Sequence, residues 1–468
     1  MRALMISAMH SGAGKTVLTC GLLRALQRRG LSVAGFKCGP DYIDPLFHRR
    51  VLNMPTENLD LFLQGADGVC DTLANARANI AVVEGAMGYY DGISGTDHTS
   101  AWQLAAQQRI PTILAVRPHG TSLTLAAQLR GMQTFRSPNY VAGIVLVACV
   151  PALAAHLSPL IERECNVPVI GYLPPMEEAD FASRHLGLVT ADEVPDFQRR
   201  INAIAEQLER TCNIDALLLL ARTPRAHEEV IRAPHQPELA ETPRAPERSF
   251  SAPTLAQHKT PRVARIAVAR DEAFCFYYEQ GLAKLEECGA QLINFSPLRD
   301  ADLPDADALY LGGGYPELYA SALSANHSMR RAIRDAIAAG MPTVAECGGF
   351  MYLQETLVDA QGNEHAMVGA LPGRSANAKH LVRFGYAHLT TPTSTLLLRP
   401  EEQLPVHEFH HWESTHNGND LVATKPDGRS WQCCYATSTL HAGFPHLHFA
   451  GSAPLAQRFV RAAQTYGR

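Results

Sequence analysis

The chain has 468 residues, of which 46% are hydrophobic and 19% are charged, and its formal net charge is −5 at pH 7. This composition is typical of a folded enzyme with two or three domains and argues against a disordered chain. Without an excess of basic residues there is no field to attract nucleic acid, so we do not expect nucleic acid as a partner.

The N-terminal segment lacks the uninterrupted apolar run of a signal peptide, because Gly12, Gly14 and Lys15 break it. The apolar stretch 141–155 is shorter than the ~20 residues of a membrane span and contains Pro151, so it is better explained as a buried strand that leads into a helix. Eleven cysteines without paired spacing indicate free thiols in a reducing compartment. We therefore predict a cytoplasmic protein with no membrane segment.

The first half of the chain alternates between strands and helices. Apolar, β-rich runs occupy residues 2–9, 31–37, 79–84, 111–116, 141–148 and 167–173, and helical patterns cover 17–29 and 101–108. Strands that alternate with helices predict a parallel sheet covered on both faces. The pattern ends near residue 220.

A phosphate-binding loop follows the first strand. Ser11-Gly12-Ala13-Gly14-Lys15-Thr16 would cradle phosphates with its backbone N–H groups, although Met9 stands where the first glycine of such loops is usual. In this setting Lys15 would reach the terminal phosphates, and the Thr16 hydroxyl would bind Mg²⁺.

Three carboxylates follow strands of the same sheet. Asp41 and Asp44 come after the second strand, and Glu84 ends the third. Ligands of parallel sheets bind outside the carboxyl ends of the strands, and carboxylate oxygens suit Mg²⁺. The sequence therefore predicts a nucleotide and Mg²⁺ site at this edge.

Composition changes at residues 222–262, which include seven prolines and little apolar periodicity. We interpret this segment as a linker between a domain of residues 1–221 and one of residues 263–468. The second domain has strand-like runs at 264–269, 290–295, 307–311 and 342–346, with helical patterns at 275–288 and 328–339.

The second domain carries a cysteine at a sharp strand-to-helix turn. Cys347-Gly348-Gly349 follows the strand that ends at Glu346, as in a nucleophile elbow whose nucleophile is sulfur. The N–H of Gly348 and the glycines at 312–314 would supply an oxyanion site. His446 and His448 are the candidate bases, and they would share one face of an extended segment.

The segment His407-Glu408-Phe409-His410-His411 matches the zinc-protease pattern in its letters. That chemistry requires both histidines on one helical turn, whereas Pro405 and the interleaved aromatic residues favour an extended segment that lines a pocket.

Together these segments resemble the cobyrinic acid a,c-diamide synthase family of glutamine-dependent amidotransferases. The resemblance covers nearly the whole chain apart from the linker. The matching segments are residues 11–16, 36–45, 58–60, 84–88, 184–188, 267–274, 311–317, 345–349, 407–410 and 446–449.

The resemblance implies a P-loop synthetase domain similar to dethiobiotin synthetase, followed by a class I, triad-type glutaminase. ATP would activate a carboxylate of a corrin-type macrocycle as an acyl phosphate, and ammonia from glutamine would displace the phosphate. The implied roles are ATP binding for Ser11, Gly12, Gly14, Lys15, Thr16 and Lys37, Mg²⁺ binding for Thr16, Asp41 and Glu84, carboxylate activation for Asp44, and nucleophile and base for Cys347 and His446. The wider group usually has a glutamate where His448 stands here.

Several alternatives stay open at this point. The acceptor could be hydrogenobyrinic acid or a nickel sirohydrochlorin, or the chain could be a cobyric acid synthase. A non-catalytic ATP switch related to partitioning ATPases is disfavoured, because a switch needs no elbow cysteine. The nucleotide base is also open, since residues 145–149 lack the asparagine common in relatives. A homodimer is the oligomeric state we would test first.

Overall fold

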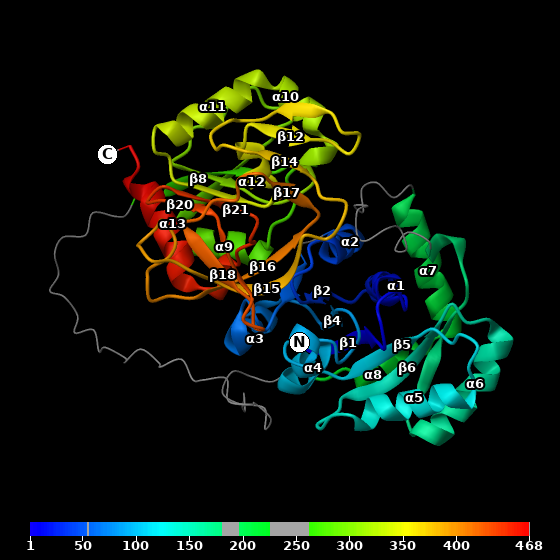
Figure 1. Cartoon of the computed structure of the whole chain (residues 1–468). Coiled ribbons are helices and arrows are strands. Elements are labelled where there is room, and N and C mark those ends of the chain that lie inside the picture. The colour runs from blue at the N-terminus through cyan, green and yellow to red at the C-terminus, as the bar shows by residue number, and fades with distance from the viewer. Residues whose placement is uncertain (54–55, 180–195, 225–261, 468) are drawn as a thin grey trace.

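The computed structural model describes residues 1–53, 56–179, 196–224 and 262–467, which form two α/β lobes (Figure 1). Most of the predicted linker and all of segment 184–188 lie outside these residues. At the near edge of the linker, Arg222 pairs with Ala3 in an isolated β-bridge. No helix in the described ranges is long and apolar enough to cross a membrane. The division into domains at 221 and 263 stays a prediction.

The first lobe is built on a seven-stranded parallel sheet in the order β3-β2-β4-β1-β5-β6-β7. Its strands are β1 (Arg2–Ala8), β2 (Val33–Cys38), β3 (Glu57–Leu59), β4 (Ile80–Glu84), β5 (Thr112–Val116), β6 (Val141–Val147) and β7 (Val169–Leu173). The predicted parallel sheet is confirmed, and segment 141–155 is indeed a strand that leads into a helix. Only β3 was missed, because three residues are too few to show a period.

Helices cover both faces of this sheet. They are α1 (Lys15–Arg28), α2 (Ile43–Leu52), α3 (Gly65–Asn75), α4 (Ala101–Gln108), α5 (Leu123–Thr134), α6 (Pro151–Cys165), α7 (Phe197–Thr211) and α8 (Ile214–Leu220). One core contains α1, α2, α7 and α8, and the other contains α3 to α6. The short apolar strands are therefore buried on both faces, as parallel sheets require.

The second lobe has a six-stranded sheet in the order β20-β21-β11-β10-β8-β9 and two four-stranded sheets, β13-β12-β14-β17 and β16-β15-β18-β19. Its strands are β8 (Ala264–Ala269), β9 (Ala290–Phe295), β10 (Ala308–Leu311), β11 (Thr343–Glu346), β12 (Thr356–Val358), β13 (Glu364–Ala366), β14 (Arg374–Asn377), β15 (Arg383–Thr390), β16 (Leu404–His410), β17 (Trp412–Ser414), β18 (Leu421–Thr424), β19 (Ser430–Cys433), β20 (Tyr435–Ala436) and β21 (Leu440–Gly443). The four predicted strands are confirmed as β8 to β11.

Its helices are α9 (Glu279–Glu287), α10 (Ala320–Ala325), α11 (His327–Ala338), α12 (Gly348–Leu353) and α13 (Ala453–Thr465). The predicted helix over 275–288 is wrong in its first turn. Phe276 instead pairs with Gly313 in an isolated β-bridge, so residues before Glu279 stay outside the helix. That arrangement places the rings of Phe276 and Tyr278 against Tyr42 of the other lobe, at centroid distances of 5.1 and 4.5 Å.

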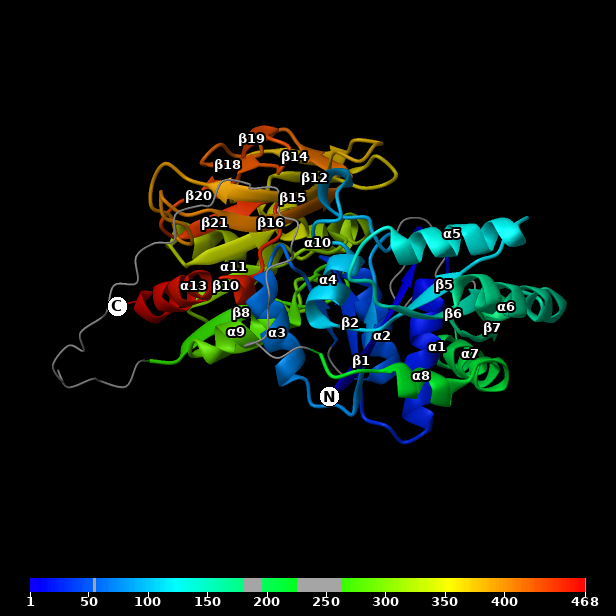
Figure 2. The ribbon, with the colours of Figure 1, turned by 90° about the horizontal axis from the view of Figure 1, so that it is seen from below.

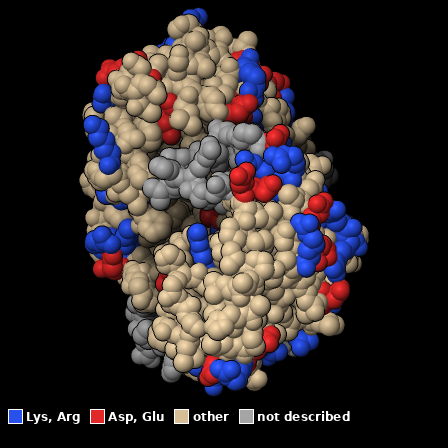
Figure 3. Space-filling view, turned by 90° about the vertical axis from the view of Figure 1, so that its right-hand side faces the viewer, with Lys and Arg blue, Asp and Glu red and all other residues tan. Residues whose placement is uncertain are grey.

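Hydrogen bonds that segment 57–60 accepts from the second lobe join the two lobes. The Tyr386 hydroxyl donates to the Asp60 carboxylate at 2.8 Å, and the Gln280 amide donates to the Asn58 carbonyl at 2.8 Å. Helix α3 lies beside the second lobe in two perpendicular views (Figures 1 and 2). On the face shown in Figure 3, the described Lys and Arg side chains are interspersed with Asp and Glu and form no extended basic patch.

Candidate active site

The phosphate loop has the backbone geometry that its glycines predict. Gly14 has a φ of 91°, and a Cβ there would lie 2.7 Å from Val147, so the loop approaches β6 closely at a position that only glycine fits. Helix α1 begins immediately afterwards, at Lys15. The Lys15 ammonium donates to the Met87 carbonyl at 2.6 Å. Burial, with a contribution from Lys37, lowers the pKa of Lys15 to about 8.

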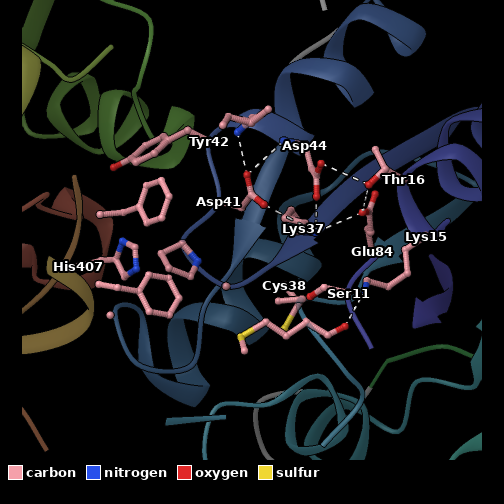
Figure 4. Close-up of a pocket in the computed structure, with 18 of the residues that line it drawn as sticks. Ser11, Lys15, Thr16, Lys37, Cys38, Asp41, Tyr42, Asp44, Glu84 and His407 are labelled. Carbon is pink, nitrogen blue, oxygen red and sulfur yellow. Dashed lines mark hydrogen bonds and ion pairs between the residues drawn. The ribbon is translucent and has the colours of Figure 1, made fainter. Parts of the chain in front are cut away.

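Lys37 stands at the centre of the predicted carboxylate cluster (Figure 4). Its Nζ lies 2.5 Å from Asp44, 3.2 Å from Glu84 and 3.8 Å from Asp41. Burial acts to lower the pKa of Lys37, but Asp44 and Glu84 outweigh it and raise that pKa well above its ordinary value. The ammonium therefore stays charged and holds the carboxylates together.

The Thr16 hydroxyl completes this cluster from the first turn of α1. It donates to Glu84 at 2.7 Å and lies 3.3 Å from an oxygen of Asp44. Asp41 has a second task, because one of its oxygens accepts the N–H groups of Ile43 and Asp44 at 2.8 and 3.2 Å. Asp41 thus closes the first turn of α2 and fixes the backbone that carries Asp44.

The surroundings shift the pKa values of Glu84 and Asp44 in opposite directions. Burial would raise the pKa of Glu84, but Lys37 and His48 hold it well below its usual range. Burial and the Glu84 charge instead raise the pKa of Asp44 well above its usual range. His48 contacts Glu84 at 2.7 Å, and both side chains are fully buried. His48 was not predicted, although it follows Asp44 by four residues and such pairs share a helix face.

The second site is the turn between β11 and α12. Cys347 has φ 48° and ψ −103°, a conformation that non-glycine residues rarely adopt, and its N–H donates to the Gly443 carbonyl at 2.8 Å. A Cβ on Gly349 would lie 2.2 Å from the Leu311 carbonyl oxygen, so the turn can be this tight only with glycine. A Cβ on Gly348 would lie 3.1 Å from the Gly314 nitrogen, so the glycine segment 312–314 comes close to the turn that carries the thiol.

His446 lies beside the thiol and is supported by a buried carboxylate. Its Nδ1 is 3.5 Å from Glu346, and the Tyr310 hydroxyl donates to the other oxygen of Glu346 at 3.0 Å. Burial lowers the pKa of His446, but Cys347 and Glu346 outweigh it and raise that pKa to about 10. The sequence pattern does not predict a role for Glu346, because the wider group has its glutamate two positions after the histidine. The feature that could identify Glu346 from the sequence is its place at the end of a buried strand, directly before the nucleophile.

His448 is engaged elsewhere. Its Nδ1 accepts the Gly451 N–H at 3.0 Å, and its ring lies 4.6 Å from that of Tyr278. Burial lowers the pKa of His448 to about 4, so this ring is neutral at physiological pH. Of the two candidate histidines, the structure brings only His446 next to both Cys347 and Glu346.

The first four residues of the segment that matched the zinc-protease pattern, His407 to His410, lie in strand β16, and His411 directly follows the strand. Because the backbone up to His410 is extended and not helical, His407 and His411 do not form the pair that a helical turn provides. The expectation of an extended segment that lines a pocket is confirmed.

Both sites open into one cavity of about 1440 Å³ between the lobes, lined by the phosphate loop and by Cys347 and His446. Tyr42, which follows Asp41, packs its ring 5.1 Å from His446 and 4.5 Å from Tyr278. A nucleotide site that shares a cavity with an elbow thiol and its imidazole defines an ATP-using glutamine amidotransferase, a carbon–nitrogen ligase.

Comparison with known proteins gives the same class. Residues 4–189 match the CobQ/CobB/MinD/ParA nucleotide binding domain, and residues 265–454 match the CobB/CobQ-like glutamine amidotransferase domain. The cobyrinate a,c-diamide synthase of Salmonella typhimurium is 37% identical over 99% of this chain and 98% of its own length, and that of Clostridium acetobutylicum is 36% identical over 98% and 100%. The chain belongs to the cobyrinate a,c-diamide synthase family, and its reaction is an amidation in cobalamin biosynthesis.

Among solved structures, that of PurLQS from Thermotoga maritima is similar over 43% of this chain and 98% of its own, with 15% identity and a TM-score of 0.31. This similarity is too low to support a conclusion about this chain.

Proposed function

We propose that the protein amidates the a- and c-acetate carboxylates of cobyrinic acid, with glutamine or ammonia as the nitrogen donor and an acyl phosphate as the intermediate. The observation that carries this proposal is the single cavity that links the Lys37 cluster to Cys347. The names of the relatives support the acceptor.

In the synthetase half, the loop from Ser11 to Thr16 holds the phosphates of ATP, and Lys15 neutralises the terminal ones. The Thr16 hydroxyl and the carboxylates of Glu84 and Asp41 are oxygen donors of the kind that Mg²⁺ takes. When bound, Mg²⁺ would offset negative charge on the transferred phosphoryl group. Lys37 and Asp44 receive the acceptor carboxylate, whose oxygen attacks the γ-phosphorus while ADP leaves.

In the glutaminase half, the Cys347 thiolate attacks the side-chain amide carbon of glutamine. The backbone nitrogens of Gly348 and Gly314 stabilise the oxyanion, and His446 donates a proton to the departing ammonia. Water then cleaves the thioester and releases glutamate. Glu346 keeps His446 oriented and its protonated form stable.

Ammonia reaches the acyl phosphate through the shared cavity and displaces inorganic phosphate. Free ammonia is mostly protonated in water at neutral pH, so release inside the protein preserves the reactive form. The segment around Tyr42 lies between the two sites, and the Tyr42 ring is 5.1 Å from that of His446.

The decisive experiment is mass spectrometry of cobyrinic acid incubated with the protein, ATP, Mg²⁺ and glutamine, where each amidation lowers the mass by one unit. Two successive steps are expected. Hydrogenobyrinic acid and nickel sirohydrochlorin serve as parallel acceptors, and conversion of one of them in place of cobyrinic acid would replace the proposed substrate. Light scattering of the same preparation tests the predicted homodimer.

A further inference from the structure

The cavity is larger than one substrate requires. Its volume of about 1440 Å³ exceeds the roughly 300–1,000 Å³ of typical small-molecule sites. The phosphate loop and the elbow thiol account for two of its walls. A third wall is formed by β15 and β16, and neither carboxylate activation nor glutamine cleavage as described above uses it.

This third wall is aromatic. Strands β15 and β16 are antiparallel, and Phe384 lies opposite Phe409 as Tyr386 lies opposite His407. Ring centroids are 5.8 Å apart in the first pair and 5.4 Å apart in the second. His411 continues the row at 5.7 Å from Phe409. We call Phe384, Tyr386, His407, Phe409 and His411 the aromatic wall, and all five line the cavity.

The alternation of strand residues explains why the wall faces the cavity. His410, on the opposite face of β16, stacks on Phe444 at 3.9 Å and is buried, although it also reaches the edge of the cavity. Phe384, by contrast, is 48% exposed although it is a large apolar ring. An apolar surface left open inside a cavity marks a place that a ligand covers. Figure 4 shows His407 on the side of the pocket opposite Lys15 and Thr16.

Positive charge borders the same wall. The Lys425 ammonium donates to the Phe384 carbonyl at 2.6 Å, and no ion pair of Lys425 is found within the described part of the chain. Arg117, which directly follows β5, lines the cavity from the other lobe and is exposed. The Tyr386 hydroxyl binds Asp60 at 2.8 Å, which fixes the wall to the lobe that carries the phosphate loop.

We propose that the aromatic wall is the binding site of the macrocyclic acceptor. The inference rests on the proposed function and adds the residues that hold its substrate. A corrin-type ring presents a broad apolar face and several peripheral carboxylates. The ring packs along Phe384 and Phe409, Lys425 and Arg117 meet carboxylates at its edge, and one carboxylate thereby extends to Lys37 and Asp44.

The test is equilibrium binding of cobyrinic acid to the full-length protein, followed by its absorbance, together with the KM values of all three substrates. Phe384→Ala should raise the Kd of cobyrinic acid about tenfold and leave the KM values of ATP and glutamine within about twofold. Lys425→Gln should raise that Kd about two- to fivefold at low ionic strength, with a smaller effect at high salt. Leu219→Ala is the matched control, because Leu219 is 76% exposed and lies outside the cavity.

An unchanged Kd in Phe384→Ala, with wild-type protein that binds and amidates cobyrinic acid, would overturn the aromatic wall alone. A raised KM for ATP in place of the macrocycle would overturn it in another way, since it would show that the wall stacks on the nucleotide base. Wild-type protein that neither binds nor amidates cobyrinic acid would overturn the proposed function, and this inference with it.

Discussion

Replacing Glu346 with glutamine tests the support of the imidazole most directly. The change keeps the size of the side chain and removes the negative charge that lies 3.5 Å from His446 Nδ1. The contact is an ion pair, and His446 Nδ1 makes no hydrogen bond within the described part of the chain. We therefore take a loss of about one pKa unit in the stabilisation of the imidazolium, which is about 1.4 kcal/mol. It corresponds to about a tenfold loss in kcat/KM for glutamine hydrolysis.

The pH profile separates this effect from a general structural one. Glu346 helps to raise the pKa of His446 to about 10. Loss of its charge lowers that pKa, so the imidazolium that protonates ammonia is lost at a lower pH, and the alkaline limb of glutaminase activity should move down. Glutamate release would be measured across the alkaline range, with thermal melting to exclude misfolding.

Tyr310→Phe is the matched variant, because it removes one hydrogen bond to Glu346 and keeps the charge. Its activity should fall less than that of Glu346→Gln, and its alkaline limb should move less. Amidation driven by ammonium chloride should be unaffected in both. If Glu346→Gln kept its kcat/KM within twofold and its alkaline limb in place, Glu346 would have no part in catalysis.

Four further outcomes are expected. Cys347→Ala should lose amidation from glutamine and keep amidation from ammonium chloride at raised pH, since only glutamine cleavage needs the thiolate; full glutamine-dependent activity would remove Cys347 as the nucleophile. His446→Ala should show a strong glutaminase defect and His448→Ala a mild one, in assays of glutamate release; equal defects would contradict our choice of base. Lys15→Ala and Glu84→Ala should each abolish amidation from either donor, and near-normal turnover with ammonium salts would exclude that residue from the synthetase site. ATP binding should weaken as pH rises through about 8, because burial lowers the pKa of Lys15 to that value and the neutral amine no longer attracts phosphate; calorimetry of the wild type should show this slope, and an identical slope in Lys15→Ala would refute it.

The parts of the fold that follow from local patterns could be predicted from the sequence. Buried parallel strands are short apolar runs, so six of the seven strands of the first sheet were found, and the loop up to Lys15 has its own glycine signature. The elbow at Cys347 was visible because a strand, a cysteine and two glycines are contiguous. In each case the signal lies within about ten residues.

What was missed depends on contacts between distant segments. Glu346 gains its relevance from His446, one hundred residues later in the chain, and no period or motif connects the two. The predicted helix over 275–288 begins too early for a similar reason. Phe276 pairs with Gly313, a distant residue, and this bridge overrides the helical propensity of the segment. Apart from β15 and β16, the strands from Thr356 onward have only two to four residues, and they pair in an order that sequence patterns do not reveal.

The ring of Tyr42 has a consequence for stoichiometry. It belongs to the segment that carries Asp41 and Asp44, yet it packs 5.1 Å from the imidazole of His446. If the segment shifts when an acceptor binds at Asp44, the shift reaches Tyr42, two residues earlier, and through its ring the glutaminase site. Glutamine hydrolysis would then depend on whether the acceptor site is occupied. We expect Tyr42→Ala to release more glutamate than it forms amide, whereas the wild type should keep the two in step. Equal yields of glutamate and amide in the variant would mean that some other contact couples glutamine hydrolysis to amidation.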